Sequence, residues 1–494
     1  MDRMRSKVLA AVLVGAVAGA LIGTPGASAA SAASLEVVGK ASLDSRGMNS
    51  ALAVAGACAY VGSRADAAPL VVDISNPAAL RVTGALTRHA GSTPRELRAI
   101  PAANELVVLY YNLSGGSNGL DLYRWTADCK SPALAGHYDF GSRAPHEFYL
   151  WQDPARPSRV LLYVSMFGAS GDGLDVIDIS DPARPVRSGG WAVPAAYGHA
   201  PLHSIDISAD GRTAYVSLWT GGLVVADSSD FATGGSNPTL KPATPPSGGY
   251  KTPPGDVHSA VPLPGRSMVL TTDERYPSPY GQGCPFGVGH VVDVSNPAAP
   301  RAIGTLAVPE NAASACAAAA KGTWTSHNPT LTAHLALVSW YSAGLQVFGL
   351  DDPANPQRLT ELRPSGVTPA LRDLQLGTTD AMTWSYPVIS SGLIYVVDIN
   401  QGLLVLRYHG PHEDEVAGSG FAEGNSNVAA ATAATPGASA GATGTSAAPA
   451  PGSAAPAVNS NPASISLPVI AGLAVLLVAL LIGGIVVLTR RRRR

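Results

Sequence analysis

The apolar and polar positions of this chain repeat one short phrase. Its clearest copies are LVVDISNP at Leu70–Pro77, LDVIDISDP at Leu174–Pro182, HVVDVSNP at His290–Pro297 and LQVFGLDDP at Leu345–Pro353. Each copy is an apolar run that ends at Asn-Pro or Asp-Pro. Proline fixes its own φ and disfavours helix at the residue before it, and Asx side chains cap turns. Each copy therefore predicts a strand that ends abruptly, and repeats of this kind predict units that stack on their neighbours.

One repeat shows all the elements of a unit. His203–Ser208 (HSIDIS) and Thr213–Trp219 (TAYVSLW) flank an Asp-Gly turn, and Leu223–Asp227 (LVVAD) follows. Asp-Gly between apolar runs is a strong hairpin signal. Alignment of the other repeats to this one predicts about seven four-stranded blades, and hence an all-β, seven-bladed propeller, with a six- or eight-bladed ring as the fallback.

The last repeat ends after its third strand. The N-terminal stretch Leu35–Leu43 (LEVVGKASL) matches the outer-strand pattern of Arg81–Leu86 (RVTGAL). We expect it to complete the last blade, because such a strand would close the ring and leave no open sheet edge at the seam.

These phrases resemble the LVIVD-repeat proteins, a family of bacterial and archaeal surface propellers. The resemblance spans most of Leu35–Tyr408 and rests on the phrase [LV]-x-V-x-D-[IV]-S-[ND]-P. It implies a propeller on the cell surface and says little about activity.

Both ends of the chain indicate export. Arg3, Arg5 and Lys7 precede the apolar stretch Val8–Ile22, and Ala27-Ser28-Ala29 offers a small-x-small cleavage pattern. We therefore predict a signal peptide at 1–29, with an uncleaved N-terminal anchor as the alternative. The propeller ectodomain is predicted at 30–412.

The C-terminal end predicts a membrane anchor. Leu467–Leu488 is uncharged and long enough to cross the hydrocarbon core, and Arg490–Arg494 follows it. We predict a single-pass helix at 465–489 with a cytoplasmic tail at 490–494, so that the N-terminal ectodomain lies outside the cell. Residues 413–464 are rich in Ala, Gly, Ser and Pro and are predicted as a disordered linker. Leu467-Pro468 also resembles a sortase signal without its Thr-Gly, which leaves cell-wall attachment as an alternative.

Composition narrows the class of protein further. The net charge is −2 and only 14% of residues are charged, so electrostatics give no argument for nucleic-acid binding.

The chain has four cysteines. An even number in an exported chain favours disulfides, with three pairings open. We favour Cys284–Cys316, since each lies in a loop-like insertion beside one repeat, which leaves Cys58–Cys129.

Histidines begin the innermost strand in four successive repeats: His146, His203, His258 and His327. Innermost strands line the axis of a propeller, so these side chains are expected to converge at one axial mouth. The second strands end on the same face, which brings Asp273, Glu274, Trp219 and Trp340-Tyr341 to this rim.

Two interpretations of these histidines stay open. Each histidine could cap a strand by bonding the backbone of the next blade, a structural role typical of repeat folds. Alternatively, the four imidazoles could bind copper, zinc or iron, with Glu147 and Asp273 as partners of the second ring nitrogens. The arrangement is similar in architecture to the selenium-binding protein and methanethiol oxidase family, and that resemblance implies a histidine-bound copper site.

Two functions follow from this. The first is a cell-surface binding or scaffold module for a protein, peptide or glycan. The alternative is a histidine-ligated metalloenzyme, oxidase-like, at the cell surface. The sequence shows neither the nucleophile elbow of a serine hydrolase nor the spacing of a calcium-binding loop.

Overall fold

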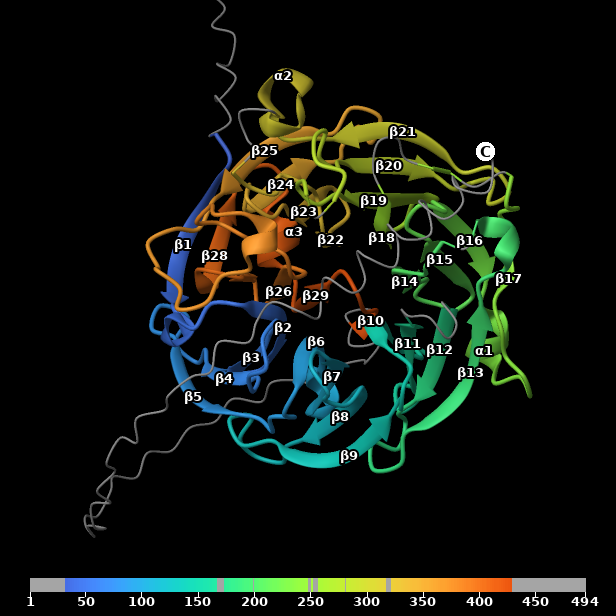
Figure 1. The fold of residues 1–494 in the computed structure, drawn as a ribbon, viewed down its shortest axis with the longest axis horizontal. Helices are drawn as coiled ribbons and strands as arrows, with labels where there is room; N and C mark the ends of the chain where they lie inside the picture. Colours follow the sequence, from blue (N-terminus) through green and yellow to red (C-terminus); the bar gives the residue numbers. More distant parts are fainter. Residues whose placement is uncertain are drawn as a thin grey trace, which may run out of the picture. The chain divides into compact units, whose positions relative to one another are not determined.

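Seven antiparallel sheets surround one axis in the computed structural model of this chain (Figure 1). The structure describes residues 32–166, 173–198, 200–247, 250–251, 256–279, 281–316 and 321–428. Six sheets have four strands, and the seventh has five. We number the blades in chain order and call the strands of a blade A to D from the axis outward. The predicted seven-bladed propeller is confirmed.

The first four blades have the following strands. Blade 1 holds β2 (Asn49–Ala55), β3 (Cys58–Ser63), β4 (Leu70–Asp73) and β5 (Arg81–Ala85). Blade 2 holds β6 (Ser92–Ile100), β7 (Glu105–Asn112), β8 (Gly119–Arg124) and β9 (Ala133–Asp139). Blade 3 holds β10 (Pro145–Gln152), β11 (Val160–Met166), β12 (Gly173–Asp178) and β13 (Val186–Ala192). Blade 4 holds β14 (Ser204–Ile207), β15 (Thr213–Ser217), β16 (Leu223–Asp227) and β17 (Lys241–Pro242).

The remaining strands complete the ring. Blade 5 holds β18 (Asp256–Pro262), β19 (Met268–Glu274), β20 (Gly289–Asp293) and β21 (Arg301–Leu306). Blade 6 holds β22 (Pro329–Leu331), β23 (Leu335–Ser339), β24 (Leu345–Gly349) and β25 (Gln357–Leu362). Blade 7 holds β26 (Val388–Ser390), β27 (Leu393–Asp398), β28 (Gly402–His409), β1 (Ser34–Ala41) and, inside β26, β29 (Phe421–Glu423).

Helices among the described residues are short and lie in the connections. They are α1 (Ser229–Thr233), α2 (Ala313–Cys316), α3 (Glu413–Ala417) and the single turns η1 (Leu43–Ser45), η2 (Pro101–Ala103), η3 (Ala195–Tyr197), η4 (Pro309–Asn311) and η5 (Leu374–Leu376). None of these helices is long and apolar enough to cross a membrane. The signal peptide and the membrane helix predicted at 465–489 lie outside the described residues.

The N-terminal strand closes the ring as predicted. β1 pairs antiparallel with β28 along its length, from Ser34 opposite His409 to Ala41 opposite Leu403. The first and last parts of the propeller are therefore held in one sheet, and the outer edge of blade 7 is supplied by the start of the domain.

The repeated Asn-Pro or Asp-Pro phrase holds neighbouring blades together. Its proline carbonyl approaches a glycine on the outer strand of the preceding blade, so closely that an added Cβ would lie about 2 Å from the oxygen: 2.1 Å for Gly39 and Pro77, 2.0 Å for Gly136 and Pro182, and 2.1 Å for Gly304 and Pro353. At the blade 4–blade 5 boundary the hydroxyl of Thr244 donates to the carbonyl of Pro297 instead, at 2.5 Å. Only a residue without a side chain, or one with a donor, fits this approach.

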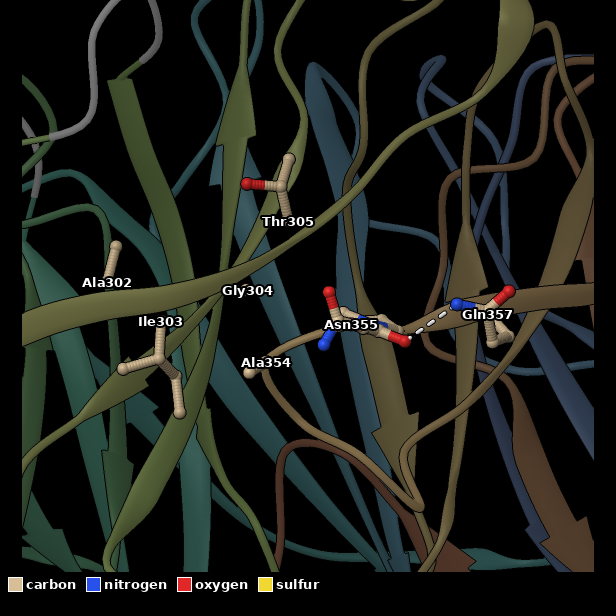
Figure 2. A pocket seen from close by; sticks show the side chains of 8 residues that line it. Ala302, Ile303, Gly304, Thr305, Ala354, Asn355 and Gln357 are labelled. Atoms are coloured by element: carbon tan, nitrogen blue, oxygen red, sulfur yellow. Dashed lines mark hydrogen bonds between the residues drawn. The ribbon is translucent and has the colours of Figure 1, made fainter.

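Figure 2 shows one of these boundaries, between blades 5 and 6. Ala302–Thr305 of β21 lie beside Ala354, Asn355 and Gln357, and the amide of Gln357 donates to the carbonyl of Asn355 at 2.9 Å. The hollow between them, about 500 Å³ in volume, is lined by backbone and by small, aliphatic and amide side chains. It lies at the outer strands, far from the axis, and offers no titratable side chain.

The two disulfides confirm the favoured pairing. Cys58 pairs with Cys129 and Cys284 pairs with Cys316, each with a Cα–Cα distance of 5.9 Å. The first joins blade 1 to the connection in blade 2, and the second joins α2 to the long connection between β19 and β20.

The C-terminal segment differs from the prediction. Residues 413–428 belong to the predicted linker 413–464, yet they fold into the propeller. β29 pairs antiparallel with β26, and Ser426 then forms a parallel bridge with Leu150 of β10. The buried side chain of Val428 packs with blade 2 and blade 3 residues. This correction has a simple reason: Phe421 and Val428 supply apolar contacts, and the asparagines between them satisfy backbone groups of β10. The rest of the predicted linker lies outside the described residues.

This segment turns back inside the axis. It runs antiparallel to β26, turns at Gly424 and returns parallel to β10. An alanine Cβ at Gly424 would lie 1.8 Å from the carbonyl oxygen of Pro329, so the turn requires glycine. Asn427 reaches the carbonyl of Ala209, in a turn that joins strands A and B of blade 4. Asn427 thus lies on the face of the A–B turns, opposite the ends where strands A begin.

Candidate metal centre

The four histidines predicted to converge do lie together, at the start of strands A in blades 3 to 6. Nε2 of His146 lies 2.9 Å from Nε2 of His203. Ring centroids are 4.0 Å apart for His203 and His258, and 3.8 Å apart for His258 and His327. We call His146, His203, His258 and His327 the axial histidines. Three of them are buried and His146 is half-buried.

β-Bulges help to direct these side chains toward the axis. The pairing of β10 with β11 skips His146, and the pairing of β18 with β19 skips His258. A bulge inserts one unpaired residue and turns its side chain away from the regular alternation of the strand. A bulge in blade 2 skips Arg95 in the same way. The motif Arg95-Glu96 therefore occupies the position that His146-Glu147 occupies in blade 3.

Hydrogen bonds define which ring nitrogen carries the proton. Nδ1 of His327 lies 2.7 Å from the carbonyl oxygen of Trp384, which can only accept. Nδ1 of His258 lies 2.7 Å from the hydroxyl of Ser259, and that hydroxyl donates to Asn328 at 3.1 Å. In both histidines Nδ1 is thus the donor, and the neutral ring presents the Nε2 lone pair to the axis.

Glu274 faces two of these Nε2 atoms. Its carboxylate oxygens lie 3.3 Å from Nε2 of His327 and 3.9 Å from Nε2 of His258. The hydroxyl of Tyr341 donates to the same carboxylate. A neutral imidazole lone pair and a carboxylate oxygen are both acceptors, so a proton or a cation between them is needed to stabilise this approach.

Burial sets the protonation of the cluster. It lowers the pKa of His203 to about 3 and lowers the pKa values of His146 and His258 well below the ordinary range, with the other histidines and Arg95 adding to the effect. Burial also lowers the pKa of His327, against the opposing charge of Glu274. For Glu274 burial raises the pKa, but the charges and hydrogen bonds of its neighbours outweigh it and lower the pKa to about 2. At neutral pH the site thus combines neutral imidazoles with one carboxylate.

The remaining predicted residues divide into two groups. Trp219 stacks on His203 at 4.8 Å, and Glu147 lies 3.9 Å from Nδ1 of His203, so both are at the site. Asp273 instead lies 3.4 Å from His290, and Trp340 is buried in the core of blades 5 and 6. The structure thus brings Trp219 and Glu147 to the axial histidines, and places Asp273 beside His290 and Trp340 in the core. Alternate residues of a strand point to opposite faces, so only one member of each adjacent pair can face the axis.

Two arginines at this mouth escaped sequence analysis. Arg64 and Arg95 lie over the ring of Trp384, at 5.4 Å and 5.3 Å from its centroid. Arg64 donates to Asp373 at 2.8 Å. Its Nε and Nη1 atoms, and Nε of Arg95, are buried without a hydrogen-bond partner among the described residues. Alignment of Arg95-Glu96 in blade 2 with His146-Glu147 in blade 3 would have identified Arg95 from the sequence.

Carboxyl groups line the next layer of the axis. Glu96, Glu147, Asp206 and Glu423 share one guanidinium, that of Arg98, which lies 3.1 Å from Glu96 and 3.2 Å from Glu423. Asn425 of the C-terminal segment donates to Glu147 at 3.0 Å. Burial raises the pKa of Glu147 to about 8 and that of Glu423 to about 7. This layer separates the axial histidines from the face of the A–B turns.

The fold and the repeats define the class of protein as a seven-bladed β-propeller. The LVIVD repeat matches residues 46–87, 162–191, 203–242 and 290–308, so the propeller of this chain contains LVIVD repeats. No curated protein matches the sequence.

Similar solved structures are propellers of low sequence identity. Periplasmic gluconolactonase PpgL of Pseudomonas aeruginosa is 15% identical, with a TM-score of 0.49, over 73% of this chain and 92% of that one. The β-propeller domain of Cps50 (Swd1) of Myceliophteria thermophila is 11% identical, with a TM-score of 0.47, over 76% and 99%. The C-terminal WD40 domain of Sif2 is 10% identical, with a TM-score of 0.45, over 75% and 97%.

Proposed function

We propose that this chain is an exported, membrane-anchored propeller whose axial histidines bind one transition metal ion. One observation carries the metal proposal: His258 and His327 present Nε2 lone pairs toward a carboxylate, Glu274, that is itself an acceptor. A cation at this point would satisfy all three groups. Export and anchoring rest on the sequence of residues 1–29 and 465–494.

The donor set fits copper, zinc or iron. Imidazole nitrogen suits all three metals, and a carboxylate can complete the ligand set. Ligand atoms of Glu147, His203 and His258, and likewise of His258, Glu274 and His327, lie within 4.8 Å of one another. His258 belongs to both groups, so we expect it to be central to the site. The carbonyl of Trp384 and the hydroxyl of Ser259 would hold the outer nitrogens, as partners of metal-bound histidines commonly do.

The chain's own residues would determine what reaches the ion. Trp219 and Tyr341 cover the sides of the site, and the C-terminal segment and carboxyl layer close it from below. His146, Arg64 and Arg95 are half-buried, so we expect a ligand to approach the ion past them. The bound metal would supply Lewis-acid or redox chemistry, and the guanidinium groups would favour an anionic ligand beside it.

Metal analysis tests this proposal. The full chain is purified without metal-affinity resin, and its copper, zinc and iron contents are measured for wild type, His203→Ala/His258→Ala and the control His137→Gln. About one ion per chain is expected in wild type and control, and a loss of that ion in the double variant.

The alternative outcome has its own meaning. If wild type carries no metal and takes up none at the axial histidines, the site is not a metal centre. The second candidate is then a binding face for a surface ligand, supported by the unpartnered nitrogens of Arg64 and Arg95 beside Trp384.

A further inference from the structure

A second group of metal-type ligands lies on the face opposite the axial histidines. His334 lies in the turn between β22 and β23 of blade 6, His412 directly precedes α3, and Glu415 lies within α3. One ligand atom from each lies within 4.8 Å of the others. The site therefore joins blade 6 to the C-terminal segment, although His334 and His412 are far apart in the sequence.

Glu415 is placed so that one oxygen is held and the other is directed at the histidines. The hydroxyl of Thr332 and the backbone N–H of His334, at 2.9 Å, donate to Oε2. Oε1 lies 2.5 Å from Nδ1 of His334 and 3.7 Å from Nδ1 of His412. The carboxylate is thus oriented by two protein donors, and Oε1 is shared by both rings.

His412 is oriented from its other side. Its Nε2 lies 2.8 Å from Oδ1 of Asp351, which follows β24 in blade 6. A carboxylate accepts, so Nε2 donates to Asp351 and Nδ1 faces Oε1 of Glu415. This is the carboxylate–histidine–metal arrangement by which metal-binding histidines are commonly oriented. The two rings stack at 4.6 Å and 16°, an approach that two charged imidazolium rings would oppose.

We infer that His334, His412 and Glu415 bind a divalent transition metal, zinc by preference, and so fix the C-terminal segment to blade 6. Zinc takes nitrogen and carboxylate ligands at about 2.0–2.2 Å, which places tetrahedral ligand atoms about 3.3 Å apart. Separations of 2.5 Å and 3.7 Å reach that value by small rotations. His334 and His412 are 39% and 27% exposed, which leaves room for rotation and for a water as fourth ligand.

An ion bound here would affect the axis through the segment that follows α3. α3 leads directly to β29, and β29 and Asn425 line the layer beneath the axial histidines. Zinc at this site would therefore hold closed the segment that blocks the axis from this face.

The test uses the full chain with two of the four axial histidines replaced, so that it does not depend on the first proposal. His203→Ala/His258→Ala protein is stripped with a chelator and titrated with zinc sulfate by calorimetry. The same background is then tested with His412→Gln, with His334→Gln, with Asp351→Asn and with the control His409→Gln, a nearby histidine outside the site. Hydrogen exchange is followed at residues 413–428.

We expect one zinc per chain in the background protein and in the His409→Gln control. Affinity should fall at least 100-fold in His412→Gln and His334→Gln, and 10- to 100-fold in Asp351→Asn, the range seen for supporting carboxylates. Zinc should slow exchange at 413–428 in the background and not in His412→Gln. Absence of zinc binding in the folded background protein, or equal binding after both histidine substitutions, would overturn the inference.

Discussion

Individual backbone conformations at the axial mouth are unusual. Trp219 and Tyr341 have φ values of 43° and 29°, in the left-handed region that bulky residues rarely adopt. Each lies two residues after strand B of its blade and packs its ring on the histidine of that blade. Its carbonyl accepts a backbone hydrogen bond from the next blade. Such strain costs on the order of 1–3 kcal/mol and persists where surrounding contacts enforce it.

A pair of substitutions measures this strain at Trp219. Trp219→Ala and Trp219→Gly both remove the ring, but only alanine keeps a Cβ at positive φ. We expect the glycine variant to be more stable than the alanine variant by about 1 kcal/mol in urea unfolding. At Trp191, in extended strand β13, the order should reverse, because glycine there only adds backbone entropy to the unfolded state. The same order at both positions would contradict the strain.

At the level of elements, the C-terminal segment changes the chemistry of the axis. β29 brings Glu423 into a layer that already holds Glu96, Glu147 and Asp206 around Arg98, with smaller effects of Arg95 on Glu96 and Glu147 and of Arg64 on Glu96. These guanidinium groups are fewer than the four carboxyl groups, so protons compensate part of the charge. This is why burial raises the pKa of Glu423 to about 7 despite its contact with Arg98.

This shift predicts a pH dependence of stability. Between pH 4.5 and about 7 the folded chain binds more protons at Glu423 than the unfolded chain does, so the free energy of unfolding falls as pH rises through this window. Glu423→Gln removes that dependence. The stability of wild type relative to the variant should therefore decrease by up to about 3 kcal/mol from pH 4.5 to 8, measured by urea unfolding. Parallel curves for the two proteins would show that folding does not change the pKa of Glu423 and would contradict the prediction.

For the whole molecule, the ring depends on close contacts between blades. At three of the boundaries described above, the proline carbonyl of the phrase contacts a glycine on the outer strand of the preceding blade. The LVIVD phrase is thus explained by docking between blades as well as by the turn that it forms. Closure of the ring by β1 and β28 makes every blade dependent on two neighbours.

A matched pair of glycines tests this docking. In Gly304→Ala the new Cβ would lie 2.1 Å from the carbonyl oxygen of Pro353, so blades 5 and 6 must separate slightly. We expect a loss of about 1–3 kcal/mol in the free energy of unfolding. Gly84, on the equivalent strand β5, has no atom within 4 Å of an added Cβ, and Gly84→Ala should change stability by less than about 0.5 kcal/mol. Equal effects would mean that the boundary adapts without cost.

The sequence by itself determined the features that repeat. Apolar runs, Asx-Pro ends and Asp-Gly turns recur locally, so they predicted the blade number, the closing strand and the shared position of His146, His203, His258 and His327. The cysteines were few enough for position alone to favour the observed pairs.

Tertiary structure alone decided what does not repeat. Bulges direct His146, His258 and Arg95 toward the axis, and strand alternation directs Glu274 there while Asp273 faces His290. A change of one residue in register cannot be read from the composition of a strand. The segment 413–428 reads as linker because it is short and polar, and its order depends on partners in blades 3 and 7. His334, His412 and Glu415 meet for the same reason: their proximity is set by the closed ring, which joins residues that no local pattern connects.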